Sequence, residues 1–182
     1  MFDLIKKNKL IINQADFKKH ILNGMPIVSK IFNFDINLHK LKFIKKEIDL
    51  TFSFENCIFN NVDFSFHTFE KRIKFRNCIF NDFFAMSVFY PEGFEMINCN
   101  ITENFDVCCG GHNLNDSFIL ENTTINGFAN FQDCLFMNKV FIKNNIFVNG
   151  SNILGNSILG TEVEFQKEFY IENNLGNIHV HH

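Results

Sequence analysis

Three side chains that can bind metal or act as nucleophiles, Cys108, Cys109 and His112, occur close together near the middle of the chain. A zinc site needs three or four ligands that converge at about 2.0–2.3 Å from the ion, but adjacent residues of an extended chain point to opposite sides. A nucleophilic thiol needs a positioned base, and a single histidine does not establish one. We therefore predict no catalytic residue, metal or cofactor, and we keep these three residues as candidate binding residues.

The same part of the chain is rich in acids and lacks bases. No Lys or Arg occurs between Asn77 and Asn138, although the whole chain contains 17 of them. Six acids in this window are candidate binding residues on an anionic surface: Asp82, Glu92, Glu95, Glu103, Asp106 and Asp116. Residues 1–50 show the opposite balance, with ten Lys against five acids. This asymmetry indicates a charged surface for a partner.

An internal repeat of about 21 residues suggests which elements carry these side chains. The segment Phe54–Phe59 returns at Phe75–Phe80 and at Met96–Ile101, each time with Asn-Cys at the same two positions. Large apolar residues advance by steps of five and six at both ends of the repeat region: Phe54, Phe59, Phe64, Phe69 and Phe75, then Phe131, Phe136, Phe141 and Phe147. These steps fit neither one face of an α-helix nor one flat strand. They predict a chain that turns a corner every five residues.

We therefore predict one all-β domain, a right-handed parallel β-helix with coils of about 21 residues. Successive coils of such a solenoid lie about 4.8 Å apart, so each repeated Phe stacks on its own copy and forms an interior column. Cys57, Cys78 and Cys99 would stack in the same way as small buried residues without chemistry. The alternative is a three-faced parallel β-helix in which the asparagines before these cysteines form a turn ladder.

The five-residue repeat is most regular in residues 129–141. A small residue stands two positions before a central Phe, with Ala129 before Phe131 and Cys134 before Phe136. This pattern resembles the pentapeptide-repeat proteins, whose unit has a small residue, then often Asn or Asp, then a central Leu or Phe. The resemblance implies a four-faced right-handed β-helix over residues from about 38 to about 159. Some pentapeptide-repeat proteins are rod-shaped DNA mimics that bind bacterial topoisomerases, so the resemblance also permits that mode of action.

Signals at the N-terminus predict a cap on the solenoid. Asn13 can cap a short helix with Asp16 three residues on, Gly24 can end that helix and Pro26 prevents its continuation. The predicted parts are a cap with one short helix at residues 1–30, the β-helix at 31–165 and a C-terminal coil or tail at 166–182. An uncovered solenoid end promotes edge-to-edge association, so we expect any homo-oligomer to form through such an end.

The regular spacing breaks once, because the interval from Met96 to Leu120 exceeds the length of the repeat. Extra residues in a coil usually form a loop on one face, and loops on rigid scaffolds often carry function. The interruption at residues 105–118 contains the three candidate Cys and His residues, so it is the best local candidate for a site. A structural turn that needs Gly110 and Gly111 is the competing interpretation.

Membrane insertion and export are not predicted. Asn, Lys or Asp interrupts every apolar run well before the length of a membrane span, and lysines interrupt the N-terminal segment where a signal peptide would need an apolar run. Six cysteines in such a chain indicate reduced thiols rather than a disulfide framework. We therefore predict a cytoplasmic protein.

The leading functional prediction is a non-catalytic scaffold that presents a rigid flank of the β-helix to another protein. A polysaccharide lyase of this fold needs clustered acids together with a basic residue, and the acidic window contains no Lys or Arg. The alternatives are a DNA mimic that binds topoisomerases and a β-helix that acts on or binds carbohydrate. We do not expect direct nucleic-acid binding.

Overall fold

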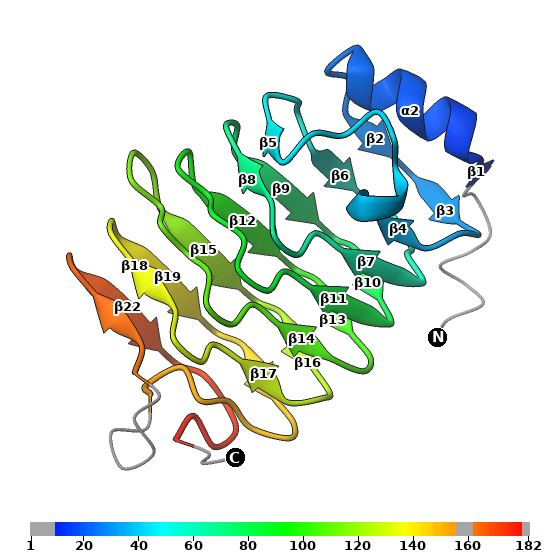
Figure 1. The fold of residues 1–182 in the computed structure, drawn as a ribbon. Coiled ribbons are helices and arrows are strands. Elements are labelled where there is room, and N and C mark those ends of the chain that lie inside the picture. Colours follow the sequence, from blue (N-terminus) through cyan, green and yellow to red (C-terminus); the bar gives the residue numbers. More distant parts are fainter. Residues whose placement is uncertain (1–9, 156–161, 180–182) are drawn as a thin grey trace.

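The computed structural model describes residues 10–155 and 162–179, which wind into a β-solenoid of about six turns with one α-helix (Figure 1). Strands of successive coils lie side by side, and their pairing is parallel throughout the described residues. The predicted parallel β-helix is thus confirmed. Within the same residues, the helix is too short to cross a membrane.

Four ladders of strands run along the solenoid, and we number them faces 1 to 4 in the order in which each coil visits them. Face 1 contains β2 (Ile27–Val28), β6 (Ser53–Glu55), β9 (Ile73–Arg76), β12 (Phe94–Ile97), β15 (Phe118–Glu121), β19 (Val140–Lys143) and β22 (Phe169–Glu172). Face 2 contains β1 (Leu10–Ile12), β3 (Lys30–Phe32), β10 (Ile79–Phe80), β13 (Asn100–Ile101), β16 (Thr124–Ile125) and β20 (Ile146–Phe147), with single bridges through Ile58 between β3 and β10.

Faces 3 and 4 complete each coil. Face 3 contains β4 (Ile36–Asn37), β7 (Asn61–Asp63), β11 (Asp82–Phe84), β14 (Phe105–Asp106) and β17 (Ala129–Asn130). Face 4 contains β5 (Glu47–Ile48), β8 (Thr68–Phe69), β18 (Leu135–Phe136) and β21 (Glu164–Phe165), with Phe89 and Gly111 bridging β8 to β18. A short 3-10 helix, η1 (Leu38–Lys40), follows β4. Four ladders agree with the four-faced coil and not with the three-faced alternative.

Contacts between equivalent positions of successive coils give the length of each coil. Asn77 and Asn98, which are joined by a side-chain hydrogen bond, lie 21 residues apart along the chain, and this is the predicted length. The next coil is longer, since Cys99 bonds to Thr123, 24 residues away. The coil after it, from Thr123 to Asn145, has 22 residues. The first and last coils are longer still, with 29 residues between equivalent positions in the last. The repeat length of 21 residues therefore holds from Phe54 to Met96 and varies in the other coils.

Phenylalanine rings form stacked columns inside the solenoid. The rings of Phe54 and Phe75 lie 5.0 Å apart and nearly parallel, and those of Phe59 and Phe80 lie 4.8 Å apart. All four side chains are buried. Stacked aromatic pairs contribute about 0.5–1.5 kcal/mol each beyond the burial of apolar area. The predicted Phe columns are confirmed except at Phe141, which lies on the outer side of β19 and stacks on Tyr170 because Val140 and Ile142 point inward.

Three cysteines share one inward position at the corner between faces 1 and 2. The thiols of Cys57, Cys78 and Cys99 are buried, and each donates to the carbonyl two residues earlier, at 3.2 Å for Cys78. Thr123 and Asn145 continue this column and also donate to backbone carbonyls. A hydrogen bond with Cys78 and burial raise the pKa of Cys57, and burial raises the pKa of Cys78. These residues therefore act as buried packing groups, as predicted.

A ladder of asparagines precedes this column. Its members have φ between 50° and 57°, in the left-handed region: Asn56, Asn77, Asn98, Asn122, Asn144 and Asn173. Asparagine tolerates this conformation better than most residues, which is why it recurs at this corner. The turn ladder expected of the three-faced alternative is thus present, but it forms one corner of a four-faced coil.

The helix α2 (Gln14–Leu22) covers the N-terminal end of the solenoid (Figure 1). The side chain of Asn13 accepts the Asp16 N–H at 2.9 Å, and Phe17 and Ile21 are fully buried against the first coils. Gly24 ends the helix region with φ +63°. The predicted helical cap is therefore present, although the ladders extend beyond the predicted boundaries: β1 and β2 lie within residues 1–30, and β22 lies within residues 166–182.

Candidate functional site

The six candidate acids fall into two separate groups. Glu92, Glu95 and Asp116 lie on or beside face 1, whereas Asp82, Glu103 and Asp106 lie on or beside face 3. Faces 1 and 3 are not adjacent in a four-faced coil, so these acids do not share one anionic surface.

Two acids of face 1, Glu95 and Asp116, pair with arginines from earlier coils, whereas Glu92 accepts the side-chain amide of Asn115. Arg76 donates to the carboxylate of Glu95, and Arg72 donates to Asp116 and also lies 3.9 Å from Glu95. The side chain of Glu95 is only 7% exposed, so its charge holds coils together rather than attracts a partner. These pairs were not predicted from the sequence, although the repeat itself places Arg76 one coil away from Ile97, two residues after Glu95.

Two acids of face 3, Asp82 and Asp106, also serve the fold, whereas Glu103 is an exposed side chain. The carboxylate of Asp106 accepts the Cys108 N–H at 3.0 Å and the Asn130 side-chain amide at 3.2 Å. Asp82 accepts both the backbone N–H and the side-chain amide of Asn104. These bonds close local turns and join adjacent coils, which is a recurrent use of Asp and Asn side chains.

The interruption in the spacing lies mainly at the corner between faces 4 and 1. On face 4 the step from Phe89 to Gly111 exceeds the repeat by only one, while on face 1 the step from Met96 to Leu120 exceeds it by three. Most of the extra residues therefore fall after Gly111. Gly111 has φ +101°, and a Cβ there would lie 2.4 Å from the Leu135 carbonyl oxygen. The turn thus requires glycine at this position, which agrees with the interpretation of this segment as a structural turn.

Asn113 anchors this corner from inside. Its side chain is fully buried, its amide donates to the carbonyls of Asp116 and Lys139, and its oxygen accepts the Met137 N–H at 3.1 Å. The side-chain amide and oxygen of Asn113 are thereby satisfied by groups from two coils. The extra residues form a fixed corner rather than a projecting flap.

Cys108 and Cys109 point to opposite sides, since the first is buried and the second is exposed. Burial, helped by Asp106, raises the pKa of Cys108, and burial lowers the pKa of His112. A protonated thiol and a neutral imidazole do not form the activated pair that a cysteine nucleophile needs. Across residues 10–155 and 162–179, no three His, Cys, Asp or Glu side chains gather where a metal ion could bind.

Exposed apolar side chains lie at the corner between faces 3 and 4 and on face 4, beside the predicted site residues. Phe66, Met86 and Phe89 are 51%, 38% and 37% exposed. The His112 ring lies 4.0 Å from the ring of Phe89, and the His39 ring lies 5.9 Å from that of Phe66. We call these five residues the apolar ridge. Of the predicted site residues, His112 belongs to it.

Phe66 adopts an unusual backbone conformation on this ridge. Its φ is +62°, and Ser87, Cys109 and Asp133 have positive φ at the equivalent position of the next three coils. The other three residues are small or polar, whereas a bulky aromatic residue is strained in this region. A strained and exposed Phe fits a binding role better than a packing role. Phe66 was not among the predicted site residues, although it falls outside the steps of five that connect Phe64 to Phe69.

The fold and the ridge together define a β-solenoid repeat protein with an exposed apolar surface on one corner. Searches of family models, of curated proteins and of solved structures found no match to this chain.

Proposed function

We propose that the protein is a non-catalytic scaffold that binds another protein through the apolar ridge. The observation that carries this proposal is the exposure of Phe66 on a strained backbone, next to Met86 and Phe89. Aromatic residues and Met are enriched at protein interfaces, and exposed apolar patches mark such surfaces. Stacked coils hold the three side chains in fixed positions, so binding costs little ordering entropy.

The resemblance to pentapeptide-repeat proteins remains part of the proposal. Four ladders, together with the buried side chains of Ala129, Phe131, Cys134 and Phe136, support it. All six cysteines are free thiols, which supports the cytoplasm as the compartment. The separation of the acids over faces 1 and 3 gives no support to a DNA mimic, and the described residues offer no constellation that favours a carbohydrate site.

The test compares partner capture by the native protein and by a ridge variant, Phe66→Ser/Met86→Ser/Phe89→Ser. Captured proteins are identified by mass spectrometry, and the affinity of each purified candidate is then measured by calorimetry. We expect the ridge variant to lose at least about 2 kcal/mol of binding free energy, because apolar anchors dominate such interfaces.

The control for this experiment is Leu114→Ser/Val148→Ser, which removes apolar side chains elsewhere that are at least as exposed as Met86 and Phe89. It should bind like the native protein. Equal binding by the ridge variant and the native protein would exclude the ridge as the interface, and enzymatic turnover of a defined substrate would exclude the non-catalytic role.

A further inference from the structure

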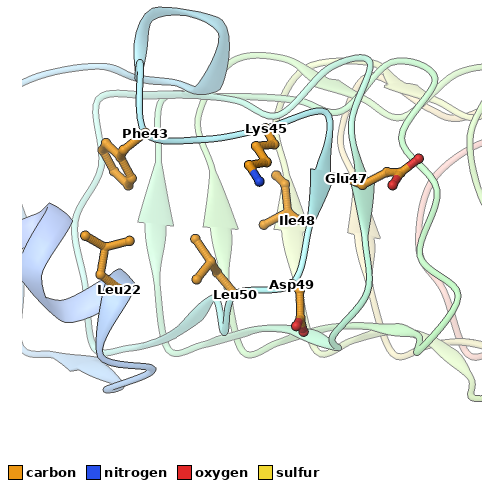
Figure 2. Close-up of a pocket in the computed structure, with 7 residues that line it drawn as sticks. All are labelled: Leu22, Phe43, Lys45, Glu47, Ile48, Asp49 and Leu50. Atoms are coloured by element: carbon orange, nitrogen blue, oxygen red, sulfur yellow. The ribbon is translucent and has the colours of Figure 1, made fainter.

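A groove lies between the helix α2 and the segment 40–50, near the N-terminal end of the solenoid. Its first part is an apolar hollow of 280 Å³, and Figure 2 shows Leu22 from the helix beside Phe43 and Leu50 from the segment. Ile48 lies at the same hollow. Its second part, which we call the basic hollow, has 380 Å³. Phe43 lines both hollows, so they adjoin each other on its two sides.

The basic hollow gathers positive charge without compensation. Lys18, Lys40 and Lys42 line it, and the remaining lining residues include no acid. All three lysines are exposed, and the ion pairs found in residues 10–155 and 162–179 include none of them. The Lys18 ammonium lies 5.3 Å from the Phe43 ring, which places charge directly beside an apolar surface. Uncompensated like charges around a depression attract an anionic group.

The apolar hollow limits what kind of anion fits. Glu47 and Asp49 line it on the side away from Phe43, and Lys45 lies between Phe43 and Glu47, so the acids outnumber the one base of this hollow (Figure 2). A long polyanion such as a nucleic acid would bring phosphates against these acids. A peptide avoids this conflict, because it can place an apolar side chain in one hollow and carboxylates in the other.

We propose that this groove binds a peptide segment of a partner protein in which an apolar side chain adjoins a cluster of Asp or Glu residues. The apolar side chain packs against Leu22, Phe43 and Leu50, and the carboxylates pair with Lys18, Lys40 and Lys42. This site is separate from the apolar ridge, and it can bind its peptide even if the ridge binds nothing.

The test is selection of random heptapeptides displayed on phage against the native protein, followed by affinity measurement with the synthesised peptides. We expect the selected peptides to combine an apolar residue with adjacent acids. Lys40→Glu/Lys42→Glu should weaken their binding about tenfold, since two attractive pairs become repulsive. The control Lys139→Glu/Lys167→Glu makes the same change of net charge at exposed lysines outside the groove and should leave the affinity unchanged.

A second variant tests the apolar half of the groove. Leu22→Ser should weaken the same peptides about tenfold through loss of apolar contact, whereas Leu114→Ser, at a Leu of equal exposure, should not. The triple ridge variant should bind the peptides like the native protein, which separates this proposal from the ridge. Selection without an acidic bias, failure to select any peptide, or equal binding by the groove variants would overturn the proposal.

Two further probes address other polyanions. A single-stranded oligonucleotide or phosphatidylserine vesicles that bound more tightly than the peptides, with the same dependence on Lys40 and Lys42, would assign the basic hollow to phosphates and overturn the peptide proposal.

Discussion

The buried thiols connect the stability of the solenoid to pH. Cys57, Cys78 and Cys134 lie in the interior and have raised pKa values, about 12 in the case of Cys134, where burial is the main cause. In the unfolded chain, a thiol ionises near pH 8.5. The folded protein therefore holds protons at alkaline pH that the unfolded chain releases. The contribution of these thiols to stability is fully present below about pH 8.5 and is lost progressively as the pH rises from there through the folded pKa.

We predict that the free energy of unfolding falls by about 1.4 kcal/mol per pH unit for each such thiol above about pH 8.5. Urea denaturation under reducing conditions, repeated from neutral pH to about pH 10, measures this slope. Cys134→Ala should reduce the slope by the contribution of one thiol, at the cost of a lower stability at pH 7. A stability independent of pH over this range would show that the thiols ionise in the folded protein as well.

Phe66 gives a second prediction at the scale of one residue. Phe66→Asn should raise the free energy of unfolding by about 1 kcal/mol, because Asn accepts the left-handed conformation that strains Phe. The same change should weaken binding of the partner at the ridge. Thermal denaturation and calorimetry measure the two effects on one sample, and a loss of stability would instead assign Phe66 a packing role.

At the scale of the element, the asparagine ladder defines the corner between faces 1 and 2. Asn77→Ala should destabilise the protein by about 1 kcal/mol more than Asn77→Gly, since both changes remove the side chain but only Ala resists positive φ. Both variants lose the contact with the Asn98 amide, so the difference isolates the backbone conformation. Urea denaturation curves of the two variants provide the comparison, and equal midpoints would contradict it.

The elements that follow the repeat could be predicted from the sequence. Phe54 and Phe75 stack because they occupy equivalent positions of successive coils. The same repeat of 21 residues predicted that Cys57 lies beside Cys78. Contacts between residues outside the repeated positions were not predictable in this way. Glu95 meets Arg76 and Arg72 only because of where outward side chains lie on face 1. The two arginines lie outside the acidic window in the sequence, so the window gave no indication that they pair with Glu95.

The candidate surfaces were harder to predict for a related reason. Phe66 is one of 26 phenylalanines, and composition alone does not separate an exposed ring from a buried one. The groove depends on the segment 40–50, which belongs to a first coil longer than the repeat and so has no repeated copy to indicate its path. Both surfaces arise where the chain departs from its repeat.

At the scale of the whole molecule, the two ends of the solenoid differ. The helix α2 buries Phe17 and Ile21 against the N-terminal coils, whereas no strand covers β22 in the described residues. Phe169 on β22 is 49% exposed, while Phe118 and Val140 at the same position of the two preceding coils are buried. We therefore expect any homo-oligomer to form through the C-terminal end, where Phe169 is exposed.

This asymmetry predicts a gradient of amide hydrogen exchange along the solenoid. In a stack of coils, each coil is stabilised by its neighbours, so a terminal coil with one neighbour opens more easily than a central coil with two. Exchange followed by mass spectrometry should be slowest in β9, β12 and β15 and clearly faster in β22, with β2 protected beneath α2. Equal protection of β22 and β12 at all protein concentrations would contradict the open end, whereas protection of β22 that increases with protein concentration would show that a second copy covers it.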